Sequence, residues 1–140
     1  MTLVIDASMA LAWVFERQQA SDAQRASELL ACCGQQAWWV PGLWHLEVAN
    51  ALLVAERRGV IAQDASDLFL ARLSSLPICA DSDAGPEQQP RLIALARAHG
   101  LSSYDATYLD LAHRLGAALA SFDRQLNQAA VAMGVPLYLI

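Results

Sequence analysis

Lysine is absent from this sequence of 140 residues, and all nine of its basic residues are arginine. Mechanisms that need a lysine side chain are therefore excluded: Walker-type phosphate loops, Schiff-base chemistry, and phosphotransfer by an aspartate paired with a lysine. A structural zinc site is disfavoured as well, since neither the cysteines nor the histidines have zinc-ligand spacing. The three cysteines, an odd number, favour a reducing compartment over a disulfide framework.

Long apolar runs and strong positive charge are also missing. No stretch approaches the ~18 apolar residues that span a bilayer, and the first residues lack the basic start and apolar core of a signal peptide. The net charge of −5 argues against nonspecific binding of nucleic acid through a broad basic face. With 56% hydrophobic and 16% charged residues, we expect one globular domain over residues 1–140, cytoplasmic and not associated with membranes.

Short apolar runs alternate with helical segments along the chain. The apolar runs predict strands at 3–5, 38–40, 76–79, 117–120 and 137–140. Periodic spacing and stop signals predict helices at 8–17, 21–33, 44–58, 63–75, 87–99, 102–115 and 124–133. Pro77 favours a sheet edge for the third strand. Strands separated by helices indicate an α/β fold with three layers, α/β/α, around a mostly parallel sheet of four to five strands.

The first apolar run, Leu3-Val4-Ile5, ends abruptly on Asp6, and Ser8 follows two positions later. In open α/β sheets ligands bind outside the carboxyl ends of the strands, where Asp6 would then lie. A helix cap explains the same residues, because either side chain can accept hydrogen bonds from the first N–H groups of the next helix. This segment alone leaves both interpretations open.

Three further acids occupy comparable places. Asp123 ends another apolar run just after Ser121, Glu47 lies in the first turns of an otherwise apolar helix, and Asp105 lies in the first turn of the helix before the Asp123 strand. Taken alone, Glu47 and Asp105 are also explained by the positive end of the helix dipole. The carboxyl ends of parallel strands lie on one edge of a sheet, however, so all four acids could converge there.

Converging carboxylates repel one another unless cations hold them together. Hard oxygen ligands suit magnesium or manganese and not zinc. Metal ions held by carboxylates, with no lysine and no paired histidines, indicate hydrolysis of phosphodiesters by metal-activated water. The sequence therefore predicts a divalent metal site at this edge.

Four segments resemble the signature segments of PIN-domain ribonucleases: LVIDAS at 3–8, WHLEVANAL at 44–52, SSYDATYLDLA at 102–112 and ASFDRQL at 120–126. The match covers essentially the whole chain, with the acids in the family's order and spacing. The size and short arms are most similar to the VapC toxins of bacterial toxin–antitoxin pairs. One departure is Ser121, which stands where the family often has Thr and keeps a hydroxyl there.

The resemblance implies roles for particular residues. The acids of the catalytic and metal-binding site would be Asp6, Glu47, Asp105 and Asp123. Polar supports of that site would be Ser8, Asn50 and Ser121. The candidates for RNA contact are Arg17, Arg57, Arg58 and Arg124.

The resemblance also implies an activity and partners. The chain would be a Mg²⁺-dependent endoribonuclease, with Mn²⁺ as a substitute, that acts as a toxin, forms a homodimer and binds a VapB-like antitoxin. Such an antitoxin typically places a basic or aromatic side chain near the acids. A catalytically inactive PIN-like binding or scaffold module stays open as the alternative, although the intact acid set argues against it. An aspartate-nucleophile phosphatase is disfavoured because Ser8 replaces its second Asp.

Overall fold

The structure is a computed structural model that describes residues 1–17, 19–82 and 85–138. Within these ranges one sheet contains four strands: β1 (Thr2–Ile5), β2 (Ala37–Pro41), β3 (Ile78–Asp81) and β4 (Ala118–Ala120). Their spatial order is β3-β2-β1-β4, and every neighbouring pair is parallel. The predicted edge position of the third strand is confirmed, since β3 pairs only with β2 among the described strands.

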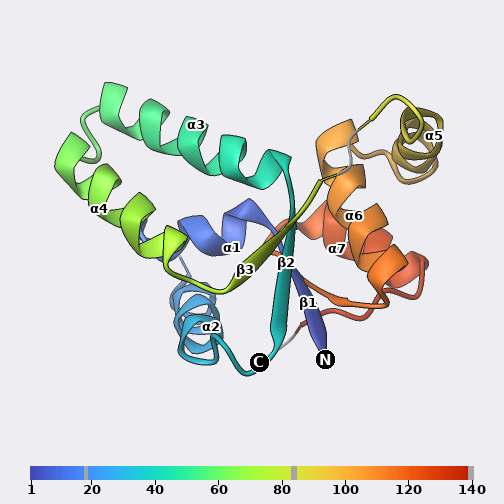
Figure 1. The fold of residues 1–140 in the computed structure, drawn as a ribbon, viewed down its shortest axis with the longest axis horizontal. Helices are drawn as coiled ribbons and strands as arrows, with labels where there is room; N and C mark the ends of the chain where they lie inside the picture. Colours follow the sequence, from blue (N-terminus) through green and yellow to red (C-terminus); the bar gives the residue numbers. More distant parts are fainter. Residues whose placement is uncertain (18, 83–84, 139–140) are drawn as a thin grey trace.

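Helices cover both faces of the sheet (Figure 1). On one side lie α1 (Ala7–Leu11), α2 (Ala20–Ala31), α3 (Leu43–Arg57) and α4 (Gln63–Ser74). On the other side lie α5 (Gln89–His99), α6 (Ser103–Leu115) and α7 (Arg124–Ala132). The predicted three-layer α/β/α arrangement is confirmed. In the described part of the chain, no helix combines the length and hydrophobicity needed to cross a membrane.

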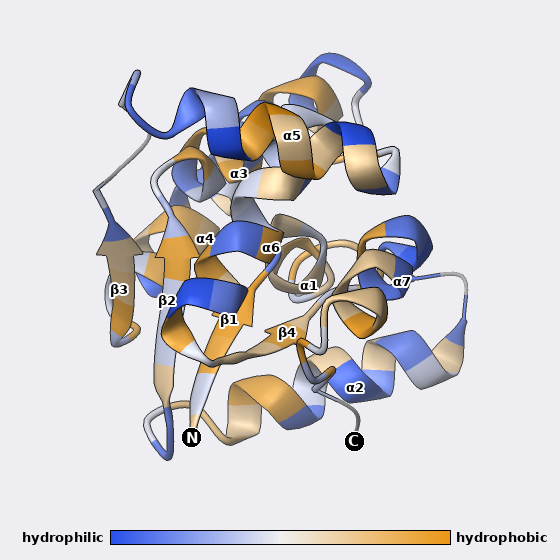
Figure 2. Ribbon diagram, turned by 90° about the vertical axis from the view of Figure 1, so that its right-hand side faces the viewer, coloured by the Kyte–Doolittle hydropathy of each residue, from blue (hydrophilic) through white to orange (hydrophobic). Residues whose placement is uncertain are grey.

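The core lies along β1, whose residues Leu3, Val4 and Ile5 are fully buried. A strand covered by helices on both faces needs apolar side chains at consecutive positions, which explains this uninterrupted run. Figure 2 shows the hydrophobic residues gathered on the strands and the hydrophilic ones on the outer turns of the helices. On one side of the sheet, the Trp13 ring stacks on Trp38 of β2 with their centroids 5.9 Å apart.

Several predicted boundaries differ from the structure by one or more residues. The first helix ends at Leu11 and continues as turns, because the Trp13 indole N–H donates to the Ala26 carbonyl (2.8 Å) and holds this segment against α2. The third strand covers Ile78–Asp81 and not 76–79. Of the strand predicted at 137–140, Leu137 forms an isolated parallel bridge to Leu119, while residues 139 and 140 lie outside the described residues.

A buried acid ties α5, α6 and β3 together. The Asp110 carboxylate on α6 accepts two hydrogen bonds from Arg91 on α5 (2.8 and 3.0 Å) and one from Arg114 Nε (2.8 Å). Arg114 also donates to Asp81 on β3 (2.9 Å). Charge-assisted bonds of this kind are roughly twice as strong as neutral ones. They hold α6, the helix that carries Asp105, against its neighbours.

Candidate active site

The site lies where the order of the strands reverses. The chain runs from β1 to β2 and β3 on one side, and β4 then pairs with the other side of β1. In open parallel sheets the crevice at such a switch point is where ligands bind. A cleft of about 500 Å³ opens here, and all four predicted acids line it. The cleft-lining residues are Asp6, Ala7, Ser8, Leu11, Arg17, Glu47, Asn50, Ala51, Asp105, Phe122 and Asp123.

Asp6 is the most deeply buried of the four acids, at 6% exposed. It precedes α1, but its side chain makes no cap hydrogen bond, so the cap interpretation of this residue is wrong. Its Oδ2 accepts hydrogen bonds from the hydroxyls of Ser8 (2.8 Å) and Ser121 (2.7 Å). The backbone of Ala7 also forms a hydrogen bond with this carboxylate.

The two serines join Asp6 to the loop after β4. The Ser8 hydroxyl oxygen accepts from the Phe122 N–H (3.2 Å), and the Ser121 hydroxyl oxygen accepts from the Asp123 N–H (2.9 Å). Each hydroxyl therefore donates to the carboxylate and accepts from the backbone of the neighbouring strand's loop. This arrangement fixes the orientation of the Asp6 carboxylate.

Asp123 and Asp105 both open helices, each in a different way. Asp123 caps α7, since its Oδ1 accepts from the Leu126 N–H (2.8 Å), and it also lines the cleft. For α6 the cap is Ser102, whose hydroxyl accepts from the Asp105 N–H (3.0 Å). The Asp105 carboxylate is thus not needed as a cap and lies along the cleft. Capping and cleft lining are compatible for Asp123, because a carboxylate has two oxygens.

Glu47 has a partner that the sequence interpretation missed. The buried Tyr108 hydroxyl on α6 donates to Glu47 Oε1 on α3 at 2.6 Å. The sequence did contain a signal for Tyr108. It follows Asp105 by three residues, and this spacing places the two side chains on one face of a helix. Phe122 was also missed as a lining residue, and Asn50 lines the cleft as an exposed side chain.

Burial and mutual repulsion raise the pKa of three of the acids. For Asp6, Glu47 and Asp105 burial is the largest cause. Neighbouring carboxylates add to it: Asp123 acts on Asp6 and Asp105, and Asp6 acts on Glu47 and Asp105. Hydrogen bonds have the opposite effect: those from Ser121 and Ser8 lower the pKa of Asp6, and the one from Tyr108 lowers the pKa of Glu47. The acids are therefore close enough to feel one another's charge.

The donor set of this cleft suits a hard divalent cation. As the side chains stand, no group of three His, Cys, Asp or Glu residues among the described residues is arranged to hold a metal ion. Asp105 and Asp123 are only partly buried, so their rotamers can change. A cation between the acids would offset the repulsion among them, and carboxylate oxygens are the ligands that Mg²⁺ and Mn²⁺ prefer.

Of the four arginines predicted to contact RNA, Arg17 lines the cleft. Its guanidinium carbon lies 4.5 Å from the centroid of the Phe122 ring, and it donates to Asp22 at 3.1 Å. These contacts hold a positive charge at the rim of an acidic cleft. The other three do not line it: Arg57, Arg58 and Arg124.

Replacing Asp105 by Asn is expected to raise the melting temperature by about 2 °C at pH 7 in a chelating buffer. The substitution removes a charge that Asp123 and Asp6 repel, and it keeps the backbone bond to Ser102. The gain is small because the side chain is half-exposed and water screens the repulsion. Thermal unfolding of both proteins measures it.

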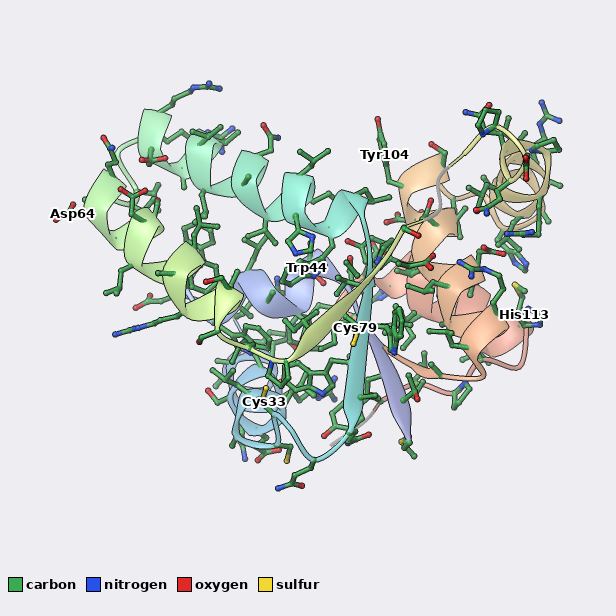
Figure 3. The ribbon with its side chains drawn as sticks, in the orientation of Figure 1. Cys33, Trp44, Asp64, Cys79, Tyr104 and His113 are labelled. Atoms are coloured by element: carbon green, nitrogen blue, oxygen red, sulfur yellow. The ribbon has the colours of Figure 1, made fainter. Side chains whose placement is uncertain are left out.

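The pH dependence of this gain follows from the raised pKa of Asp105. A carboxyl with a raised folded-state pKa binds protons more readily when folded, so wild type gains stability as the pH falls toward the ordinary value of 3.8. The advantage of Asp105→Asn should shrink toward about pH 4. Asp64→Asn, on the outer side of α4 (Figure 3), is the control without a gain. Equal melting temperatures at pH 7 would contradict the repulsion.

Known proteins share the sequence family and the fold of this chain. A model of the PIN domain family matches residues 3–132. Ribonuclease VapC3 of Pyrobaculum aerophilum is 32% identical over 136 residues, which cover 97% of this chain and 100% of that protein. The crystal structure of PAE2754 from the same organism has a TM-score of 0.70 at 22% identity and covers 92% of this chain and 84% of that one.

A second solved structure, FitAcB from Neisseria gonorrhoeae, has a TM-score of 0.66 at 11% identity, over 98% of this chain and 96% of that one. Because their sequence identities are low, these two structures support the fold alone. The family follows from the sequence matches over nearly the whole chain. This protein therefore belongs to the PIN domain family and has a VapC ribonuclease among its relatives.

Proposed function

We propose that this protein is an endoribonuclease that hydrolyses RNA phosphodiester bonds with water activated by Mg²⁺, for which Mn²⁺ can substitute. The observation that carries this proposal is the cleft at the switch point, lined by four carboxylates from four separate segments. The relative named as a ribonuclease supports RNA as the substrate.

In this proposal the residues that hold the metal are Asp6, Glu47, Asp105 and Asp123. A bound divalent ion activates water and neutralises the charge that develops on the leaving oxygen. Ser8 and Ser121 keep the Asp6 carboxylate oriented by donating hydrogen bonds to its Oδ2. Fixed donors of this type spare the site from reorganising during the reaction.

Arg17 would bind the RNA backbone. It is the basic residue among those that line the cleft, and its planar guanidinium suits a phosphate group. The Phe122 ring beneath it keeps the guanidinium at the rim. The Asn50 amide, exposed in the cleft, would add a neutral donor. Arg57, Arg58 and Arg124 would contact the RNA backbone farther from the acids.

We also propose that the protein is the toxin of a cytoplasmic toxin–antitoxin pair, inhibited by a VapB-like antitoxin. An apolar groove of about 760 Å³, lined in part by Phe15, Val54 and Val60, adjoins the acidic cleft, and Ala51 lines both. An antitoxin with an apolar face and a basic side chain would match this groove and the acids beside it. Exposed apolar side chains on α3 and α4 favour a homodimer, including Leu46, Leu53 and Leu68.

The ends of the cleaved RNA test the reaction. Purified protein with Mg²⁺ and a single-stranded RNA should leave 5′-phosphate and 3′-hydroxyl ends, because water and not the ribose 2′-hydroxyl attacks the phosphorus. A 2′-deoxy substitution at the cleaved position should therefore leave cleavage there possible. Ends with a 2′,3′-cyclic phosphate would contradict this mechanism. Failure to cleave any RNA would contradict the proposed activity.

A further inference from the structure

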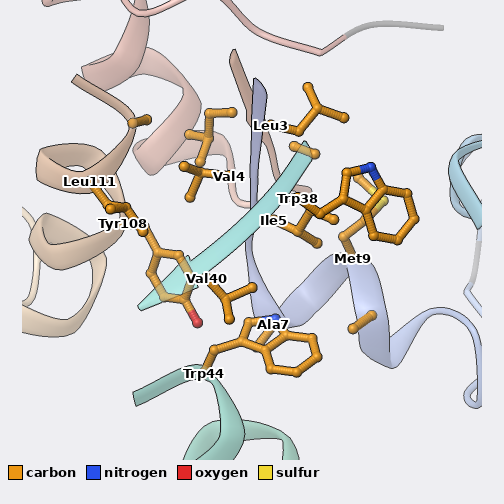
Figure 4. Close-up of a cluster of buried hydrophobic side chains, with 14 of the residues drawn as sticks. Leu3, Val4, Ile5, Ala7, Met9, Trp38, Val40, Trp44, Tyr108 and Leu111 are labelled. Atoms are coloured by element: carbon orange, nitrogen blue, oxygen red, sulfur yellow. The ribbon is translucent and has the colours of Figure 1, made fainter. Parts of the chain in front are cut away.

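Tyr108 is a buried residue one helical turn after Asp105, and it does not line the acidic cleft. Its hydroxyl nevertheless reaches the cleft wall by donating to Glu47 Oε1 at 2.6 Å, across 61 positions of sequence. Figure 4 shows its ring within the cluster of buried apolar side chains that also contains Val40 and Trp44. The hydroxyl is thus a polar group held at a fixed place by apolar packing.

The hydroxyl lies between two elements that supply acids. Besides Glu47 of α3, Asp6 and the backbone of Ala7 lie near it, where β1 ends and α1 begins. The distance of 2.6 Å from its oxygen to Glu47 Oε1 makes Tyr108 the hydrogen-bond donor that links α6 to this acid.

Glu47 needs such a donor to stay at the cleft. Its side chain has three rotatable bonds, and the carboxylates of Asp6 and Asp105 lie close enough to repel it. Without a partner, repulsion would turn the carboxylate toward solvent. A tyrosine ring immobilised by packing loses little entropy when it makes this bond, whereas a long flexible donor would lose more.

We propose that Tyr108 is a positioning residue that holds the Glu47 carboxylate toward the other acids, in the arrangement that binds the divalent ion. This inference rests on the proposed function, because it assigns a role within the same site. Tyr108 touches neither substrate nor metal and acts through Glu47. Helix α6 then contributes two groups to the site. One is the acid Asp105, and the other is the Tyr108 hydroxyl, which positions Glu47 of α3.

Titration with Mn²⁺ in the absence of RNA tests this role. Tyr108→Phe removes one oxygen and keeps the ring, and it should weaken Mn²⁺ binding by about 10- to 100-fold, the usual effect of losing a group that orients a metal ligand. Tyr138→Phe is the matched control, since its ring lies near Glu28 and Cys32 of the α2 end and should leave Mn²⁺ affinity unchanged. Unchanged Mn²⁺ affinity of Tyr108→Phe would overturn the proposal.

A double-mutant cycle separates positioning from a general loss of stability. In a Glu47→Gln background, Tyr108→Phe should reduce Mn²⁺ affinity no further, because the carboxylate that it positions is gone. Independent, multiplying effects of the two substitutions would overturn the proposal. Circular dichroism of each variant should show the wild-type fold, since Phe fills the same space.

Cleavage kinetics add a second readout. Tyr108→Phe should lower kcat with little change in the KM for RNA, because the hydroxyl lies outside the cleft. If wild type binds Mn²⁺ but cleaves no RNA, the proposed function fails, and the titrations alone still support or overturn the role of Tyr108. If wild type binds no Mn²⁺, both proposals fail.

Discussion

Replacing Asp6 by Asn should lower the rate of RNA cleavage by about a thousandfold, which corresponds to a loss of about 4 kcal/mol of transition-state stabilisation. Asparagine has the same shape, and its carbonyl oxygen can still accept from Ser8 and Ser121. The substitution therefore removes a negative charge from the buried end of β1 and little else. Initial rates on one RNA oligonucleotide with Mg²⁺ measure the effect.

Loss of folding does not explain this expected result. Burial raises the pKa of Asp6, so its ionised form costs the folded protein stability, and an uncharged residue relieves that cost. Asp6→Asn should therefore melt at the same or a higher temperature than wild type in a chelating buffer. Asp64→Asn, on the outer side of α4, controls for the loss of a negative charge elsewhere. Wild-type cleavage by Asp6→Asn would show that the site is assigned to the wrong residues.

Removal of divalent ions should abolish cleavage, and addition of Mg²⁺ or Mn²⁺ in excess of the chelator should restore it. Without a cation, the negative charge of a cleft lined by four carboxylates would repel an RNA phosphate. The same ions should stabilise the fold, by about 2.7 kcal/mol at a concentration 100 times the Kd. Thermal unfolding with and without Mn²⁺ measures this second effect.

Asp6→Asn is the control for the metal experiment, since it should lose most of the stabilisation by Mn²⁺. The outcome also separates the enzyme from the alternative of an inactive PIN-like scaffold. A scaffold has no reason to keep a divalent site in this cleft and should show no Mn²⁺-dependent rise in melting temperature. Cleavage that persists in excess chelator would contradict a metal-dependent mechanism.

The sequence by itself determined the layers of the fold and the place of the acids. Apolar runs that are too short for helices, separated by helices, require a parallel sheet covered on both faces. Asp6 and Asp123 stand directly after such runs, and the carboxyl ends of parallel strands share one edge. These are local patterns, so they can be recognised without knowledge of which elements touch.

Only the tertiary structure decided which polar groups meet. The bond from Tyr108 to Glu47 joins two helices across 61 positions, and no local pattern encodes it. Asp110 shares a motif with Asp105, yet it faces Arg91 and Arg114 instead of the cleft. Side-chain direction depends on how α6 is rotated against the sheet, which packing fixes over the whole core.

Packing between distant segments also decided that Arg17 lies at the cleft and that the first helix ends at Leu11. Arg17 reaches the cleft because the chain turns after Leu11, and that turn depends on Trp13 packing against β2 and α2. Helical spacing alone predicted a longer helix there. Periodicity identifies an element and its buried face, but contacts between distant segments decide where it ends and what its polar side chains touch. The four acids and the two serines beside Asp6 could thus be located from the sequence, whereas the tyrosine that donates to Glu47 could be located only from the packed structure.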